Sequence, residues 1–201
     1  YTRSLIETLR QPLEDGYITV ARANQTVTYP SNFTLIASMN PCPCGNYGSK
    51  DRECKCSPSQ IHKYLSKISG PIMDRIDIHI EVDNISYNDL HSDKKEESSA
   101  DIKKRVDKAR NIQLERFKGT KTFSNAKMSV PQTKKFCKLS PQCEQLLEQA
   151  FTNLKLSARA HDRILKVART IADLAGEEEI LPQHIAEAVS YRGLDRKYWN
   201  I

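Results

Sequence analysis

Residues 33–57, FTLIASMNPCPCGNYGSKDRECKCS, join an apolar run to a loop that contains four cysteines. The run at 33–40 has the length and composition of a strand buried in an α/β sheet. The Cys-rich loop at 41–57 carries two Cys-x-Cys pairs separated by nine residues. This stretch therefore predicts an α/β unit in which a central strand leads into a cysteine-bearing loop.

Four thiolates at this spacing can surround one tetrahedral metal ion, and structural zinc is the metal that such ligands favour. The residues concerned are Cys42, Cys44, Cys54 and Cys56. One residue separates the members of each pair, whereas two are commoner in structural zinc sites, so short-range disulfides and free thiols remain alternatives. No open coordination position is visible, which disfavours a catalytic metal.

The residues before this stretch predict a helix and a hairpin. Thr2 can cap a helix over 3–10, which Pro12 and Gly16 then end. Residues 17–29 alternate polar and apolar side chains on both sides of a turn, which is typical of a β-hairpin.

The residues after the cysteines predict one more helix and one more strand. Ser57 and Pro58 are typical of a helix start, here for a helix to about residue 68. Strict alternation at 76–82 predicts a strand with one solvated face. A polar, charged stretch without periodicity follows at 91–99.

The rest of the chain is predicted to be helical. Apolar residues at helical spacing indicate four helices, one through Ile102 to Gln113, one from Pro141 to Leu154, one that Gly176 ends, and one from Pro182 to about Tyr191. The expected fold is therefore α/β over 1–84 followed by an all-α bundle over 85–201.

Composition limits the partners of the chain. Its 201 residues carry a net charge of +6, from 31 basic and 25 acidic side chains, which permits a polyanionic partner without requiring one. No signal segment and no apolar stretch long enough to span a bilayer occurs, so we expect a cytoplasmic chain without a membrane partner.

Four stretches of the sequence carry a family resemblance. They are LRQPLEDG at 9–16, TLIASMNPCPCG at 34–45, SGPIMDRIDIHI at 69–80 and SARAHDRILKVARTIADL at 157–174. These motifs resemble the magnesium-chelatase-related AAA+ ATPases of the ComM or YifB type, and the resemblance runs essentially from end to end. It implies a truncated AAA+ (P-loop NTPase) core, with hairpin and Cys-rich loop, followed by a helical lid. No G-x-x-x-x-G-K-[ST] loop and no apolar strand ending in Asp-Glu occurs, so this chain alone is not expected to hydrolyse ATP.

The resemblance implies roles for two residues of the first portion. Asn40 matches sensor 1, whose amide orients the attacking water or binds the γ-phosphate of ATP. Arg75, in the segment 70–77, matches the arginine finger that reaches the nucleotide of a neighbouring subunit. The plainer alternatives are a turn-forming asparagine and an ion pair of Arg75 with Asp74 or Asp77.

Three further arginines are candidates through the same resemblance. Arg159 resembles sensor 2, which grips the γ-phosphate from the lid, and Arg163 lies one helical turn further on as the second candidate. Either can instead be a solvated helix charge. The hairpin at 17–29 resembles the presensor 1 hairpin, which faces the central pore in related hexamers, and Arg22 near its tip is a candidate contact to a nucleic-acid backbone.

The function implied by the resemblance is that of a homo-oligomeric, hexameric ring that uses ATP and Mg²⁺ to remodel DNA. Such a helicase would drive branch migration or unwinding during recombination or natural transformation. One alternative is a motor subunit for inserting a metal into a tetrapyrrole. Another is a non-enzymatic metal-knuckle adaptor for nucleic acid or protein.

Overall fold

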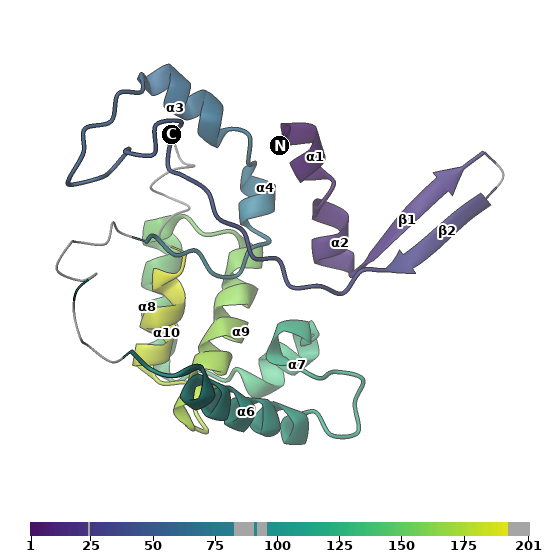
Figure 1. Cartoon of the computed structure of the whole chain (residues 1–201). Helices are drawn as coiled ribbons and strands as arrows, with labels where there is room; N and C mark the ends of the chain where they lie inside the picture. The colour runs from purple at the N-terminus through teal and green to yellow at the C-terminus, as the bar shows by residue number, and fades with distance from the viewer. Residues whose placement is uncertain (24, 83–90, 92–95, 193–201) are drawn as a thin grey trace. The chain divides into compact units, whose positions relative to one another are not determined.

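The computed structural model describes residues 1–23, 25–82, 91 and 96–192 (Figure 1). These residues belong to two compact units, which we call unit 1, up to Val82, and unit 2, from His91 onward. Each unit has its own cluster of buried apolar residues. Among the described helices, none combines the length and the hydropathy that crossing a membrane requires.

Unit 1 begins with two short helices, α1 (Arg3–Glu7) and α2 (Arg10–Asp15). The backbone N–H of Leu5 donates to the Thr2 hydroxyl over 3.4 Å, which caps α1 as the sequence indicates. A single helix over 3–10 is not what forms, because the chain starts a second helix with Pro12 near its beginning, where a missing N–H is tolerated. Gly16 ends α2 with φ 72°, a left-handed conformation that glycine adopts without strain.

The hairpin pairs β1 (Tyr17–Arg22) with β2 (Gln25–Pro30) in antiparallel register. Tyr17 lies opposite Pro30 and Arg22 lies opposite Gln25. Both strands are exposed along nearly their whole length, and Figure 1 shows the ribbon projecting from the end of α2.

The strands predicted at 33–40 and 76–82 are absent, and this corrects the sequence-based prediction. Both segments are irregular in the structure. A strand requires a hydrogen-bonded neighbour, and within the described residues the only sheet is the β1–β2 pair. Their apolar side chains are consequently exposed, to 90% at Ile36 and 84% at Val82.

Two helices complete unit 1, α3 (Pro58–Leu65) and α4 (Gly70–Met73). Ser57 and Gln60 form a capping box at the start of α3, with N···O distances of 2.9 and 3.3 Å. The predicted helix start is thus confirmed, while the helix ends about one turn earlier than residue 68. The brief α4 was not predicted.

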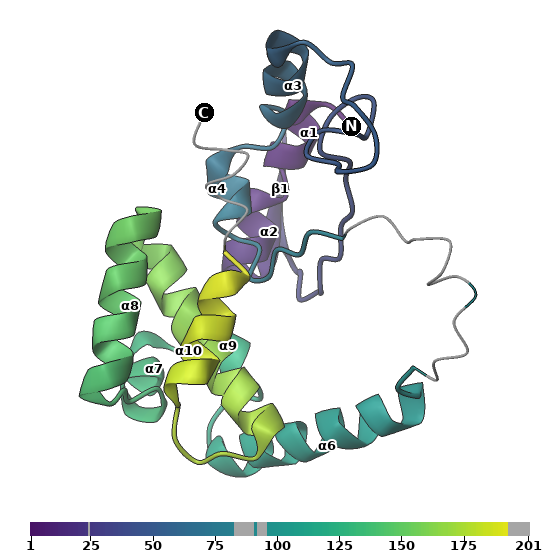
Figure 2. The ribbon, with the colours of Figure 1, turned by 90° about the vertical axis from the view of Figure 1, so that its left-hand side faces the viewer.

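Unit 2 is a helical bundle whose elements are α6 (Ser99–Arg116), the 3₁₀-helix η1 (Asn125–Lys127), α7 (Val130–Phe136), α8 (Pro141–Leu154), α9 (Ala158–Ala175) and α10 (Pro182–Ser190). The four predicted helices are confirmed, whereas η1 and α7 were not predicted. Helix α9 contacts α6, α7, α10 and η1, so it forms the centre of the bundle. Only the second half of α6 packs there, because Ala109 and Gln113 are buried while Ile102 and Val106 are exposed; Figure 2 shows the first half extending away from α9.

A buried carboxylate joins three elements of unit 2. Asp173 on α9, 1% exposed, accepts hydrogen bonds from Arg116 on α6 over 2.6 Å and from Asn125 on η1 over 2.7 Å. Arg169 donates to the same carboxylate over 3.1 Å and also to the backbone carbonyls of Glu177 and Glu178. One carboxylate therefore compensates the charges of two guanidinium groups. Arg116 joins the end of α6 to α9, and Arg169 joins α9 to the backbone that follows it.

Removing this anion should destabilise unit 2 strongly. For Asp173→Ala we expect a loss of about 3–5 kcal/mol in the free energy of unfolding, since two guanidinium groups would remain without their counter-charge. Urea unfolding followed by circular dichroism measures it. The control is Asp162→Ala on the same helix, where the side chain is 50% exposed and a change within about 0.5 kcal/mol is expected. Equal unfolding midpoints for the two variants would contradict the assigned role of Asp173.

Candidate functional site

The Cys-rich loop folds back on itself through two tight turns. The N–H of Gly45 donates to the carbonyl of Cys42 over 3.0 Å, and the N–H of Ser49 donates to the carbonyl of Asn46 over 3.1 Å. Gly45 has φ 81°, which a side chain would strain. These turns reverse the chain, so the second Cys-x-Cys pair returns beside the first.

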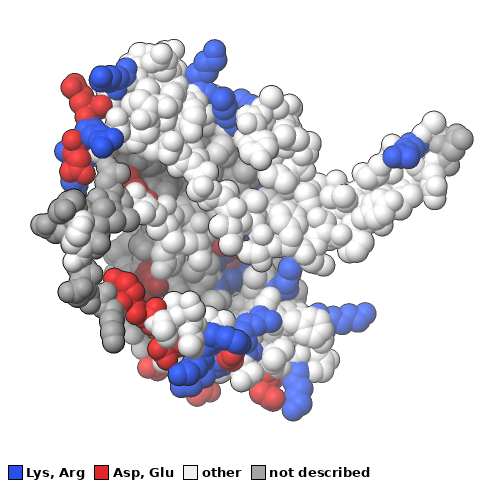
Figure 3. Space-filling model, viewed as in Figure 1, with Lys and Arg blue, Asp and Glu red and all other residues white. Residues whose placement is uncertain are grey.

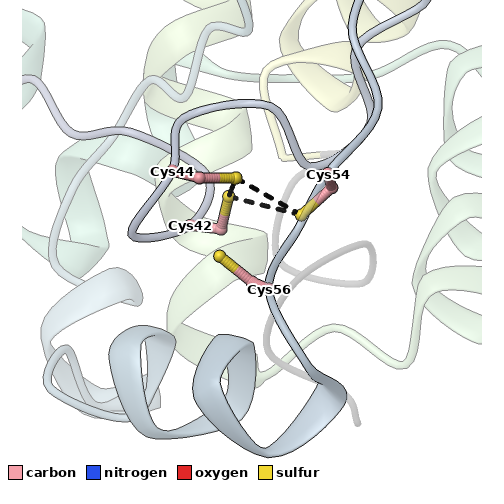
Figure 4. Close-up of side chains that lie close together, drawn as sticks. All are labelled: Cys42, Cys44, Cys54 and Cys56. Carbon is pink, nitrogen blue, oxygen red and sulfur yellow. Dashed lines mark hydrogen bonds between the residues drawn. The ribbon is translucent and has the colours of Figure 1, made fainter.

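The four sulfur atoms of this loop converge on one point (Figure 4). The Sγ atoms of Cys42 and Cys44 lie 3.4 Å apart, those of Cys42 and Cys54 3.7 Å, and those of Cys44 and Cys54 3.6 Å. With Cys56 included, all four lie within 4.8 Å of one another. A tetrahedral ion with metal–sulfur bonds of about 2.3 Å separates its ligands by about 3.8 Å, so the set is close to the size of a Cys₄ metal site.

The same distances exclude the disulfide alternative for this conformation. A disulfide requires an S–S bond of about 2.05 Å, and all four cysteines are free thiols here. The site can hold a metal ion through sulfur alone, and thiolates favour zinc over hard cations such as Mg²⁺.

Hydrogen bonds make the thiols unequal. The backbone N–H of Asn46, followed by the Cys42 thiol, lowers the pKa of Cys44 to about 6. The pKa of Cys54 instead rises to about 12: the backbone N–H of Cys56 lowers it, but desolvation and the Cys44 and Cys42 thiols outweigh that effect. A thiolate at Cys44 thus makes a second thiolate costly, and a bound cation would offset this repulsion.

The cysteines also form the core of their part of unit 1. Cys42 is completely buried, accepts the N–H of Tyr47 over 3.3 Å, and clusters with Ile61 and Leu65 of α3. Few apolar side chains are available in this cluster, so a metal ion would contribute much of the local stability.

Asn40 lies beside this loop and is exposed. A Cβ placed on Gly45 would lie 3.9 Å from both Cγ and Nδ2 of Asn40, so the amide rests against the turn of the first cysteine pair. The candidate sensor 1 residue and the cysteine cluster are therefore neighbours.

Arg75 is largely buried, with 8% of its side chain exposed. Its guanidinium is ion-paired with Glu14 of α2 and donates to the carbonyl of Pro71 over 2.6 Å. Sequence reasoning named Asp74 and Asp77 as candidate partners and missed Glu14, because a contact over 61 residues leaves no local signal. Within unit 1, Arg75 is thus an ordered side chain that links α4 to α2.

The remaining candidates lie elsewhere. Arg22 is exposed at the end of β1. Arg159 and Arg163 occupy the first turns of α9 in unit 2, the former exposed and the latter half-buried. The structure thus brings Asn40 together with the cysteines, and it has Arg159 and Arg163 one turn apart on a single helix.

Two family models match the chain in succession. The model described as magnesium chelatase, subunit ChlI, matches residues 1–90, and the one described as magnesium chelatase, subunit ChlI C-terminal, matches residues 96–192. The chain belongs to the magnesium-chelatase-related AAA+ family. The two matches meet close to the boundary between units 1 and 2.

Individual relatives support this membership. The chain is 42% identical over 198 residues to competence protein ComM of Haemophilus influenzae and 41% identical over 198 residues to the uncharacterized protein YifB of Escherichia coli, each match covering 98% of this chain. An uncharacterized protein of Mycobacterium tuberculosis is 34% identical over 94% of the chain. This magnesium-chelatase-related chain spans about 38% of the length of ComM and YifB.

The sulfur geometry predicts that the purified chain contains about one equivalent of zinc per monomer. Cys44→Ala should remove most of it, because three ligands hold the ion less tightly than four. The matched control is Cys137→Ala, which deletes a buried thiol of unit 2 and should leave the zinc content unchanged. Elemental analysis measures all three proteins, and wild-type protein without metal would contradict the assignment.

Proposed function

We propose that this chain is the nucleotide-responsive part of a ring-forming AAA+ ATPase that remodels DNA. The observation that carries the proposal is the exposed apolar segment before Asn40, where Ile36 is 90% exposed. Such a segment suits a chain whose apolar side chains are covered by the rest of an AAA+ core. The segment leads directly into Asn40 and the cysteine loop, so nucleotide sensing and the metal centre would share one element.

The donor set suits a phosphate group. Asn40 offers a neutral amide, and Arg75, Arg159 and Arg163 offer guanidinium groups, which are the groups that bind and neutralise phosphate oxygens. ATP supplies the phosphoryl bond whose hydrolysis drives the motor, with Mg²⁺ as its counter-ion. No phosphate-binding loop occurs in this sequence, so the residues named here would supply only part of the contacts to the nucleotide.

Arg75 would act on the nucleotide of a neighbouring subunit. Its ion pair with Glu14 keeps the largely buried guanidinium ordered within unit 1. A γ-phosphate carries more negative charge than one carboxylate, so it can compete for the guanidinium when a neighbour brings it close. Assembly of the ring would then be coupled to hydrolysis. Arg159, or Arg163 one turn further on, would report the same phosphate from the lid of its own subunit.

The hairpin is the proposed contact to DNA. Arg22 is the sole charged residue between Tyr17 and Pro30, and Figure 3 shows the hairpin as an uncharged arm with one basic patch near its tip. A single cation can contact one phosphate without holding the strand so tightly that it cannot move on. The name of the Haemophilus relative, a competence protein, agrees with work on incoming DNA.

Two other functions remain as outcomes to test. The family description magnesium chelatase favours a motor that inserts a metal into a tetrapyrrole. The self-contained cysteine cluster favours a metal-knuckle adaptor without catalysis. ATP hydrolysis by the complete gene product would exclude the adaptor. Stimulation of that hydrolysis by DNA rather than by a chelatase partner would exclude the tetrapyrrole motor.

The Arg75 assignment predicts a large loss of turnover with little loss of binding. In the complete gene product, Arg75→Ala should lower ATP hydrolysis by about 10³-fold or more while a fluorescent ATP analogue still binds. Glu14→Gln is the matched control: it removes the partner of Arg75 in unit 1 and should leave hydrolysis within severalfold of wild type. Equal losses in both variants would mean that the ion pair is structural.

Mixed rings give a second test of the same interface. If Asn40 acts on its own subunit's nucleotide and Arg75 on the neighbour's, mixing Asn40→Ala and Arg75→Ala subunits restores about one interface in four by random assortment. Phosphate release should therefore recover in the mixture. No recovery would place both residues in the same subunit's site.

The assignment of the hairpin to DNA contact predicts that a variant can lose DNA unwinding while it keeps ATP hydrolysis. Arg22→Ala in the complete gene product should keep ATP hydrolysis but lower ATP-dependent unwinding of a branched DNA, and Arg22→Lys should restore most of it because the positive charge returns. A strand-displacement assay measures both variants. Unchanged unwinding by Arg22→Ala would remove the hairpin from the DNA path.

A further inference from the structure

An open groove of about 490 Å³ runs between α3 and the cysteine loop in unit 1. Its lining residues are Pro43, Cys44, Lys55, Cys56, Gln60, Lys63, Tyr64 and Lys67. One side is the cysteine loop and the other is a single face of α3 and the residue stretch just beyond it. The groove is thus built on the cysteine loop and α3, and nothing in the proposed nucleotide chemistry uses it.

The groove is positively charged. Three exposed lysines line it, Lys55 on the loop and Lys63 and Lys67 on the helix side. The lining includes no acidic residue, and the ion pairs found within the described parts of the chain include none of these lysines. Figure 3 shows scattered basic side chains around the region of α3, with acidic side chains beside some of them. A ligand with several negative charges fits this arrangement.

An aromatic ring lies among the lysines. Tyr64 is half-buried, packs against the cluster of Cys42, Ile61 and Leu65, and also lines the groove. The Nζ atom of Lys67 lies 5.7 Å from the centre of its ring, which is within the range of a cation–π contact. A ring that is fixed on one side and next to cations on the other is suited to stacking a planar, anionic ligand.

We propose that this groove binds single-stranded nucleic acid, with Lys55, Lys63 and Lys67 contacting successive phosphates and Tyr64 stacking on a base. The combination of cations with a fixed ring selects this occupant, because an acidic peptide would need the lysines but gain nothing specific from the ring. The inference deepens the proposed DNA function by adding a contact site away from the hairpin. Because the binding needs no ATP, it can be tested separately from the motor.

The charge test compares two triple variants in the purified, zinc-replete chain. Lys55→Ala, Lys63→Ala and Lys67→Ala together should weaken binding of a labelled oligothymidine by about tenfold or more, and lower the slope of log K against log salt by about 2, since each phosphate contact on a single strand accounts for about 0.7. The control removes the same charge from exposed lysines of unit 2, Lys121, Lys134 and Lys138, and should change both quantities much less. Fluorescence anisotropy over a salt series measures them. Equal losses in both variants, or no binding by wild type, would overturn the proposal.

The ring test distinguishes nucleic acid from an acidic peptide. Tyr64→Phe keeps the ring and should retain oligothymidine affinity, whereas Tyr64→Leu fills the space without a ring and should lose severalfold to tenfold. Zinc content of both variants verifies that the loop is intact. Equal affinities for oligothymidine, or polyglutamate binding as tight as oligothymidine binding, would overturn the stacking role. The proposed motor fails on a different measurement, the absence of ATP-dependent unwinding by the complete gene product, so the two failures are distinguishable.

Discussion

Four sulfur atoms within 4.8 Å of one another are the constraint on which unit 1 depends. Residues 41–57 form two turns that reverse the direction of the chain. This path buries Cys42 and packs α3 against it. The apolar cluster around Cys42 is too small to hold such a loop by burial alone, so ligand-to-metal bonds would contribute what a larger core contributes elsewhere. The position of Asn40 and that of the lysine groove both depend on this loop.

In unit 2, a buried carboxylate rather than a cysteine cluster joins the elements. Asp173 holds Arg116 and Arg169 and so ties α6 and η1 to α9 in the interior of the bundle. Burial lowers the pKa of Arg169, and the neighbouring Asp173 carboxylate offsets part of this shift. The candidate sensor arginines occupy the other end of the same helix. In the proposed motor, a rigid α9 would carry any movement of Arg159 through the whole of unit 2.

The sequence predicted correctly those features that depend on residues close together in the chain. The helices α8 and α10 were found from the prolines at their starts, Pro141 and Pro182, and the four cysteines were found from their pairing. The predictions at 33–40 and 76–82 were wrong because a strand is a property of two segments, and no described segment pairs with either. The contact of Arg75 with Glu14 spans 61 residues, and the groove joins residues from a loop and a helix, so neither leaves a periodic pattern.

The ion pair of Arg75 with Glu14 bears directly on how a ring could control hydrolysis. An arginine that must reach a neighbour's phosphate costs less to position if it is already ordered, because the side-chain entropy is lost before the neighbour arrives. A partner that holds it too strongly would keep it from the phosphate. Glu14 is 38% exposed whereas the Arg75 side chain is 8% exposed, so water reaches the carboxylate of this pair more than the guanidinium. The proposed role of Arg75 therefore requires a neighbour's phosphate to displace Glu14 from a guanidinium that is already ordered within unit 1.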